Sequence, residues 1–197
     1  MSQEISRICV FCGSSDGNDP KIIEEANHLG KVFAERNITV VYGGSQLGIM
    51  GAVAKSCLEA GGKAVGIIPE FLKTKEIVHT GLDELITTQT MHERKLKMQE
   101  VSDGFITLPG GFGTFEELFE IITWSQLGLH HKPIGLLNTN GFYNALIEML
   151  DEMVKRGFLK QENRDLLIVN TDIKRLLDAM EQFEPDLQSK FLKPENT

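Results

Sequence analysis

Short apolar runs alternate along the chain with longer segments in which apolar residues recur every three or four positions. The runs have the length of buried strands and lie at residues 7–14, 38–44, 63–69, 84–90, 104–109, 132–138 and 165–170. The amphipathic segments predict helices at residues 20–33, 47–61, 91–102, 115–127, 142–157 and 172–183. This alternation is typical of an α/β fold with a parallel, doubly wound sheet and helices on both faces. In a chain of 197 residues it predicts a single domain over residues 1–184, followed by a polar tail at 185–197.

Residues typical of helix ends support these boundaries. Asp19 followed by Pro20 predicts a helix start, with the aspartate as the N-terminal cap. Gly61 and Gly157 follow two of the predicted helices and indicate where they end. Residues 69–82 are polar and show no regular period.

Glycine, hydroxyl and charged residues gather in the segments that follow the predicted strands. These segments are CGSSDG (12–17), YGGSQLG (42–48), IIPEFLKTKE (67–76), MHERK (91–95) and LPGGFGT (108–114). In open α/β sheets, ligands bind beyond the carboxyl ends of the strands, where the strand order reverses. The sequence therefore predicts a ligand site at this edge of the sheet.

The segment LPGGFGT leads from a predicted strand directly into a predicted helix. Its glycines let a ligand approach the backbone closely, and the start of the helix supplies free N–H groups and a positive dipole end. We expect it to hold a phosphate, with the Thr114 hydroxyl as a further donor.

Glu117 has two interpretations. It fits the end of a capping box that begins at Thr114, or it acts on a bound sugar. Either way we expect its carboxylate to be ionised near the helix start at neutral pH.

The other loops are less specific. In YGGSQLG, Gly43, Ser45 and Gly48 occupy the three glycine positions of GxGxxG, so the dinucleotide fingerprint is broken. No GxxxxGK[ST] segment is present, which disfavours P-loop enzymes. Arg94 and Lys95 are expected near the start of a helix, where a basic pair opposes the dipole unless an anion compensates.

Composition and charge narrow the partners. The formal net charge of −8 argues against a nucleic-acid or anionic-membrane surface. The N-terminus lacks the pattern of a signal peptide and no apolar run reaches membrane-span length, so we expect a cytoplasmic protein. Cys9 and Cys12 are expected to be buried on opposite faces of a strand rather than bound to zinc. His130 and His131 are expected to lie in a solvated loop.

The predicted helix at 115–127 is apolar around most of its circumference. A helix of this kind is buried on more than one side, which predicts a homodimer, although a helix covering a central strand can also be buried within one chain. The apolar positions are Phe115, Leu118, Phe119, Ile121, Ile122, Trp124 and Leu127.

The segments PGGFGTFEE (109–117), MHERK, CGSS (12–15) and YGGSQLGIMG (42–51) together resemble the Lonely Guy (LOG) family of cytokinin riboside 5′-monophosphate phosphoribohydrolases. The resemblance runs from about residue 7 to past residue 158. It implies a Rossmann-like fold, a dimer and hydrolysis of the N-glycosidic bond of a nucleoside 5′-monophosphate. The products are the free base and ribose 5-phosphate, and no cofactor or metal is implied.

The resemblance also implies site residues. The catalytic pair falls on Arg94 and Glu117. The substrate-binding positions fall on Ser14, Gly44, Glu76, Arg94, Lys95, Gly110, Gly111, Phe112, Gly113, Thr114, Phe115, Glu116, Glu117 and Thr123. Ser45 stands where the family often has glycine, which leaves substrate detail open at that turn.

Three functions compete at this point. The first is the phosphoribohydrolase, acting on a cytokinin nucleotide or on AMP. The second is a non-catalytic nucleotide-binding module, a regulator or a carrier. The third, a dinucleotide-dependent oxidoreductase, is disfavoured by the broken fingerprint. The lysine decarboxylase label carried by some family members needs a pyridoxal phosphate Schiff base, and no lysine context here indicates one.

Overall fold

Seven parallel strands form the centre of the molecule. The structure is a computed structural model that describes residues 5–73 and 78–184, so the predicted tail at 185–197 and Glu76 lie outside the described residues. The strands are β1 (Arg7–Phe11), β2 (Thr39–Tyr42), β3 (Ala64–Pro69), β4 (Glu84–Thr88), β5 (Gly104–Thr107), β6 (Ile134–Leu137) and β7 (Leu167–Asn170). Their order is β4-β3-β2-β1-β5-β6-β7, and every pair is parallel. The order therefore reverses between β1 and β5, which places the expected binding crevice there.

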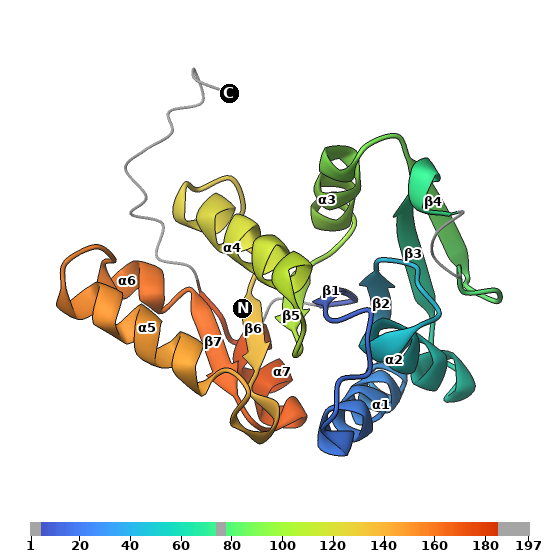
Figure 1. The fold of residues 1–197 in the computed structure, drawn as a ribbon, viewed down its shortest axis with the longest axis horizontal. Coiled ribbons are helices and arrows are strands. Elements are labelled where there is room, and N and C mark those ends of the chain that lie inside the picture. Colours follow the sequence, from blue (N-terminus) through green and yellow to red (C-terminus); the bar gives the residue numbers. More distant parts are fainter. Residues whose placement is uncertain (1–4, 74–77, 185–197) are drawn as a thin grey trace.

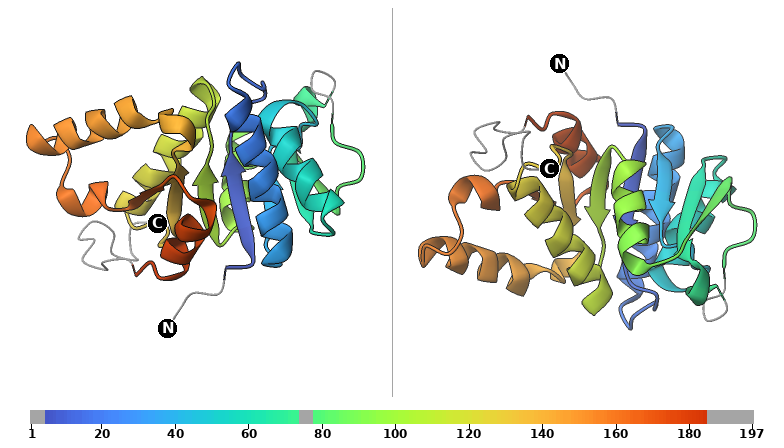
Figure 2. Two further views of the ribbon diagram at one scale, coloured as in Figure 1. Left: turned by 90° about the horizontal axis from the view of Figure 1, so that it is seen from below. Right: turned by 90° about the horizontal axis from the view of Figure 1, so that it is seen from above.

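Helices cover both faces of this sheet (Figures 1 and 2). They are α1 (Pro20–Glu35), α2 (Gly48–Glu59), α3 (Met91–Glu100), α4 (Phe112–Gln126), α5 (Asn144–Lys155), α6 (Gln161–Arg164) and α7 (Ile173–Glu181), with 3₁₀ turns η1 (Glu70–Leu72) and η2 (Thr139–Gly141). One core layer joins α1, α2 and α7 to the sheet. The opposite layer joins α3, α4 and α5 to it. The predicted doubly wound α/β fold is confirmed.

The predicted strands and long helices are all present, with some shifted ends. Asp19 caps α1 as expected, since its side chain accepts the Lys21 N–H at 3.0 Å. The short helix α6 was not predicted, because four polar residues show no period. Helix α4 begins at Phe112 instead of residue 115, a difference that matters at the site.

The predicted burial of Cys9 and Cys12 on opposite sides of the sheet is confirmed, and the histidine prediction is half wrong. Cys9 and Cys12 are buried free thiols that lie in opposite core layers. His131 is exposed, whereas His130 is only 6% exposed and its Nε2 lies 2.9 Å from the Ile121 carbonyl oxygen. Burial lowers the pKa of His130 to about 4, so this ring is a neutral core residue.

Within the described ranges, no helix combines the length and the apolar character needed to cross a membrane.

Candidate functional site

The candidate site lies where the strand order reverses, beyond the carboxyl ends of β1, β2 and β5. Backbone hydrogen bonds hold the loops together there. The Gly13 N–H donates to the Pro109 carbonyl at 3.1 Å, and the Met50 N–H donates to the Gly13 carbonyl at 3.3 Å. The loops after β1 and β5 and the first turn of α2, which are far apart in sequence, thus form one surface, as the strand order requires.

The start of α4 is uncapped. Gly111 occupies the N-terminal cap position in an extended conformation, and no side chain among residues 5–73 and 78–184 caps the helix start. The predicted capping box from Thr114 to Glu117 is wrong, because the helix already begins at Phe112. Thr114 is therefore the third helical residue and Glu117 the sixth. The free N–H groups of an uncapped helix start suit an anion, and the phosphate site expected here stays a prediction.

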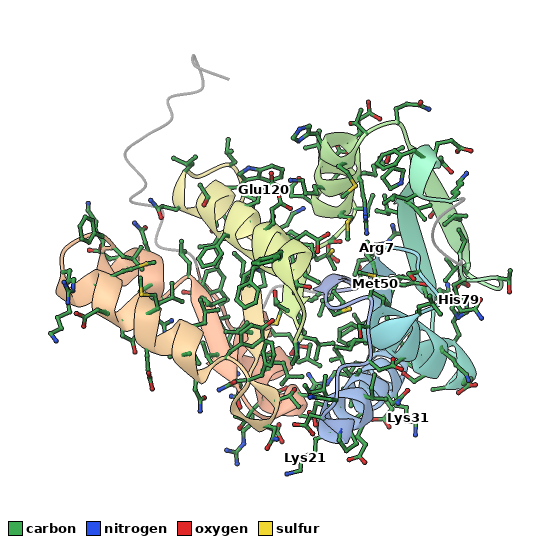
Figure 3. All side chains as sticks on the ribbon, in the orientation of Figure 1. Arg7, Lys21, Lys31, Met50, His79 and Glu120 are labelled. Atoms are coloured by element: carbon green, nitrogen blue, oxygen red, sulfur yellow. The ribbon has the colours of Figure 1, made fainter. Side chains whose placement is uncertain are left out.

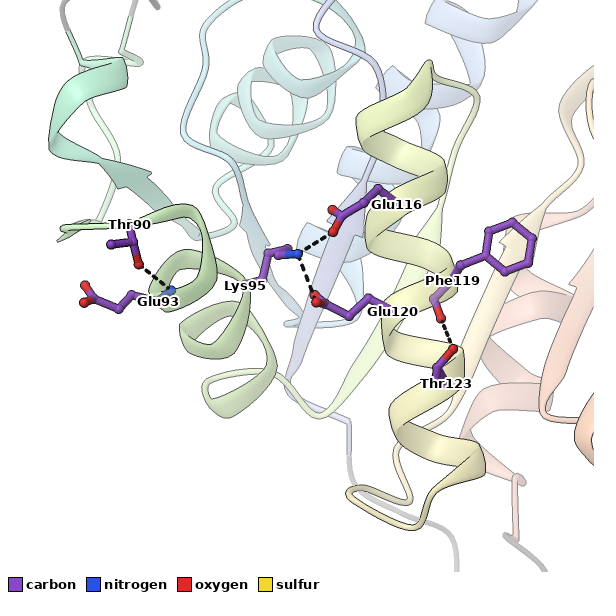
Figure 4. Close-up of polar contacts among 7 residues, drawn as sticks. All are labelled: Thr90, Glu93, Lys95, Glu116, Phe119, Glu120 and Thr123. Carbon is purple, nitrogen blue, oxygen red and sulfur yellow. Dashed lines mark hydrogen bonds and ion pairs between the residues drawn. The ribbon is translucent and has the colours of Figure 1, made fainter.

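A capping box of this type exists instead at the start of α3. The Thr90 hydroxyl accepts the Glu93 N–H at 3.1 Å (Figure 4). The Glu93 carboxylate accepts the N–H of Gln89, the residue before the cap, at 2.8 Å. It fixes the first turn of the helix that carries Arg94 and Lys95.

The three glycines of the turn differ in their surroundings. A Cβ added to Gly110 would lie 2.1 Å from Thr114 Oγ1 and 2.8 Å from the Gly13 nitrogen, so the fold itself requires glycine there. A Cβ added to Gly111 or Gly113 would meet no protein atom within 4 Å. Glycine inside a helix costs about 1 kcal/mol relative to alanine. Open space above Gly111 and Gly113 therefore suits a ligand that approaches the backbone closely.

Glu117 projects from the sixth position of α4 into a nearly dry environment. Its residue is only 9% exposed. Desolvation by burial raises the pKa of Glu117 to about 7, while the Arg94 guanidinium opposes that rise. The expectation that this carboxylate is fully ionised at neutral pH is therefore wrong, because burial outweighs the helix dipole. Burial therefore favours the protonated form of Glu117 relative to an exposed glutamate.

Arg94 lies in α3 and is 5% exposed. Its guanidinium packs on the β2 loop: a Cβ added to Gly43 would lie 2.1 Å from Nη2. Its Nε is buried and has no hydrogen-bond partner among the described residues. Buried polar atoms in native proteins nearly always have a partner, so an orphaned guanidinium N–H indicates a missing one, such as a ligand or water.

Lys95 is buried and paired with two carboxylates. Its Nζ bonds to Glu116 and, at 2.9 Å, to Glu120 Oε1 (Figure 4). Both acids belong to α4, so the ammonium bridges α3 and α4. A basic residue near a helix start was expected to need an anion. For Lys95 that anion is the pair of carboxylates of Glu116 and Glu120.

The loop after β2 is shaped by Gly44 and Ser45. Gly44 has φ +79°, a conformation that favours glycine, and its carbonyl accepts the His79 N–H at 3.0 Å. The Ser45 hydroxyl is buried and accepts the Leu47 N–H at 3.2 Å. Serine at this position therefore stabilises the turn itself. Ser14 is exposed on the neighbouring loop.

Three other expected binding residues lie on α4. Phe112 is 98% exposed at the helix start, whereas Phe115 packs edge-on against Tyr143 with ring centroids 5.8 Å apart. Thr123 is exposed and donates to the Phe119 carbonyl at 2.6 Å. It lies six residues beyond Glu117, on a different side of the helix.

A separate open groove of about 790 Å³ runs along α2 and includes Gln46, Lys55 and His79. Neither Arg94 nor Glu117 lines it. Figure 3 labels His79, which lines this groove, and Glu120 of α4, which does not.

The structure thus brings Arg94, Glu117 and the first turn of α4 to one edge of the sheet, as the sequence predicted. Sequence reasoning missed Glu120, the second acid on Lys95, and the contact between Gly43 and Arg94. The spacing of Glu116 and Glu120 by one helical turn was the available signal for Glu120. No local signal existed for Gly43, because its contact joins segments 51 residues apart.

Comparisons with known proteins agree with this architecture. A protein-family model described as "Possible lysine decarboxylase" matches residues 50–180. Among solved structures, the Moco carrier protein from Chlamydomonas reinhardtii superposes with a TM-score of 0.67 at 22% identity, covering 91% of this chain and 97% of that one. The molybdenum cofactor binding protein from Rippkaea orientalis gives 0.68 at 20% identity, with coverage of 92% and 98%. At these identities the likeness concerns the fold alone.

Sequence relatives are much closer. The cytokinin riboside 5′-monophosphate phosphoribohydrolase LOG2 of Arabidopsis thaliana is 46% identical over 179 residues, 91% of this chain and 84% of the relative. The probable cytokinin riboside 5′-monophosphate phosphoribohydrolase LOGL3 of Oryza sativa subsp. japonica is 44% identical over 185 residues, 94% of this chain and 88% of the relative. By this similarity over nearly its whole length, the chain belongs to the Lonely Guy (LOG) family, the group that the family model describes as possible lysine decarboxylases.

Proposed function

We propose that the protein hydrolyses the N-glycosidic bond of a nucleoside 5′-monophosphate and releases the free base and ribose 5-phosphate. The observation that carries the proposal is one buried carboxylate, Glu117, a turn and a half inside a helix whose glycine-rich start is uncapped. The names of the relatives describe this reaction on a cytokinin riboside 5′-monophosphate.

The first turn of α4 would bind the 5′-phosphate. Its free N–H groups and positive dipole end favour an anion, and the space above Gly111 and Gly113 admits one. A phosphate held there fixes the ribose over the residues that follow in the same helix. Holding the reactant in this way removes much of the entropic barrier to reaction.

Glu117 would act on the anomeric carbon. When the bond from C1′ to the base nitrogen breaks, its electron pair leaves with the base and positive charge develops on the sugar. The ionised carboxylate stabilises that charge and accepts a proton from the water that attacks C1′. A pKa of about 7 suits this task, because a general base is most effective when its pKa lies near the working pH.

Arg94 would orient the nucleotide. A guanidinium has N–H donors and no acceptor, so Arg94 would act by donating hydrogen bonds to the substrate. The Nε without a protein partner is available to a substrate oxygen or nitrogen. The departing base gains its proton from solvent in this scheme, and a hydrogen bond from Arg94 would assist its departure.

Incubation with AMP and with isopentenyladenosine monophosphate tests the proposal, with free base and ribose 5-phosphate measured by chromatography. We expect Glu117→Gln to lose turnover by about 10²- to 10⁴-fold while AMP still binds. Tight binding of both nucleotides without any hydrolysis would favour a non-catalytic nucleotide-binding module instead. Comparing the two rates also shows whether the enzyme prefers plain adenine or an N6-substituted adenine as the base. The first preference would indicate an AMP nucleosidase, and the second a cytokinin-activating enzyme.

We also propose that two copies form a homodimer through the outer face of α4. Phe112, Phe119 and Leu127 are exposed apolar residues of this helix and its C-terminal cap, with exposures of 98%, 38% and 39%. Thr123 lies on the exposed part of the same helix, so its expected contact with substrate is better explained if it faces the site of a second copy. Light scattering of wild type and Phe119→Glu tests this: the variant should be a monomer. A cytoplasmic location stays a prediction from the sequence.

A further inference from the structure

The bridge at Lys95 has more negative than positive charge. One ammonium, on a side chain that is 9% exposed, bonds to two carboxylates from successive turns of α4. The Glu116 side chain is 54% exposed and that of Glu120 is 26% exposed, so Glu120 is the more enclosed of the two acids. An ammonium already held by two carboxylates carries no free charge for a phosphate, in contrast to the binding role expected for Lys95.

The bridge connects the immediate neighbours of the proposed catalytic pair. Lys95 follows Arg94 in α3, and Glu116 precedes Glu117 in α4. The two helices lie beside each other on the same face of the sheet (Figures 1 and 4). Fixing Lys95 between Glu116 and Glu120 therefore also fixes the distance between Arg94 and Glu117.

We propose that Glu120 is a positioning residue, which with Glu116 holds Lys95 as a strut between α3 and α4 and so sets Arg94 against Glu117. Lys95 is then a structural cation of the site and not a grip on the nucleotide phosphate. The proposal rests on the proposed function for its kinetic consequences, but its geometric part can be tested without activity.

The charged residues around Glu117 determine how its pKa should respond when the ion pairs of Lys95 are broken. Arg94 and Lys95 of α3 lower the pKa of Glu117, and Glu116 and Glu120 of its own helix raise it. Cys9 of β1 and Cys12 just after it lie within electrostatic range of Glu117, and burial raises the pKa of both thiols well above the ordinary range, so they are neutral. Neutralising Glu120 should lower the pKa of Glu117, and neutralising Lys95 should raise it.

The test compares Glu120→Gln, Lys95→Met and the double variant. Lys97→Met and Glu100→Gln are matched controls, because they break an exposed ion pair of 3.2 Å on the same helix α3. For isopentenyladenosine monophosphate or AMP, we expect Glu120→Gln to lower kcat by about 10- to 100-fold, the range for slight misplacement of reacting groups, with KM little changed. The double variant should lose no more than the worse single variant, and the controls should keep wild-type rates.

The pKa of Glu117 can be measured without any enzymatic turnover. In ¹³C NMR of glutamate-labelled protein, the Glu117 carboxyl is assigned by its absence from Glu117→Gln. We expect its titration to move to lower pH in Glu120→Gln and to higher pH in Lys95→Met. Titrations that move together or stay fixed would overturn the strut, as would a Lys95→Met variant whose only defect is loss of AMP affinity. If wild type hydrolyses neither nucleotide but a crystal structure of Lys95→Met shows Arg94 displaced from its place beside Gly43, the proposed function fails and the strut stands.

Discussion

The guanidinium of Arg94 lies so close to the backbone of Gly43 that no side chain fits between them. A Cβ at Gly43 would lie 2.1 Å from Nη2 and 3.3 Å from Cζ. We therefore expect Gly43→Ala to displace Arg94 and to lower kcat/KM by about 10- to 100-fold, the effect of small errors in the position of a catalytic group. Steady-state kinetics measures the loss, and circular dichroism checks that the fold is retained. Wild-type kinetics in Gly43→Ala would show that Arg94 is not needed where it lies.

Gly113→Ala should separate stability from binding. Gly113 lies in the first turn of α4, and an added Cβ meets no protein atom. The variant should gain about 0.5–1 kcal/mol of unfolding free energy, because alanine is the better helix former. The same methyl group should weaken AMP binding by obstructing the approach to the backbone. Urea denaturation and calorimetry measure the two effects, and unchanged AMP affinity would place the phosphate elsewhere.

The pH dependence of turnover follows from the environment of Glu117. Burial raises the pKa of this carboxyl to about 7, and the mechanism uses its ionised form. Activity should therefore fall as the pH drops through about 7, in proportion to the ionised fraction. Measuring kcat at saturating substrate between pH 5 and 9 tests this, at about half-unit steps. A rate that stays flat down to pH 5 would mean that Glu117 titrates as an ordinary carboxyl or is not the base.

The same burial should make Glu117 a cost to stability at high pH. A carboxyl whose pKa is raised on folding favours the native state below its unfolded pKa, and this contribution is lost as the pH rises through the folded pKa. The Glu117→Gln variant should therefore be more stable than wild type at pH 8, by up to about 3 kcal/mol, and the gap should close near pH 4. Urea denaturation at the two values of pH measures the difference. Equal stability at pH 8 would mean that Glu117 is better solvated than its 9% exposure indicates.

The fold could be predicted from sequence because its signals are local. Each strand is a short apolar run, and capping residues such as Asp19 mark helix starts within one turn. The start of α4 was misplaced because Gly111, Phe112 and Gly113 have low or moderate helix propensity, so the threonine that follows them resembles a cap. Free backbone N–H groups, not a side chain, define that helix start.

The sequence identified which residues gather at the site, but it did not predict the pKa of Glu117 or the ion-pair partners of Lys95. The glycine turn, Arg94 and Glu117 could be placed at one edge because parallel strands bring their carboxyl ends together. The pKa of Glu117 depends on how deeply the side chain is buried, which α3 and β1 decide through tertiary packing. The partners of Lys95 likewise come from a helix more than 20 residues away, so the lysine was assigned to the ligand.

A crystal structure of Glu117→Gln soaked with AMP tests the central claim most directly. We expect the 5′-phosphate on the N–H groups at the start of α4, between Gly111 and Thr114, with C1′ facing the side chain of residue 117. A phosphate bound in another loop, with the ribose turned away from residue 117, would contradict it.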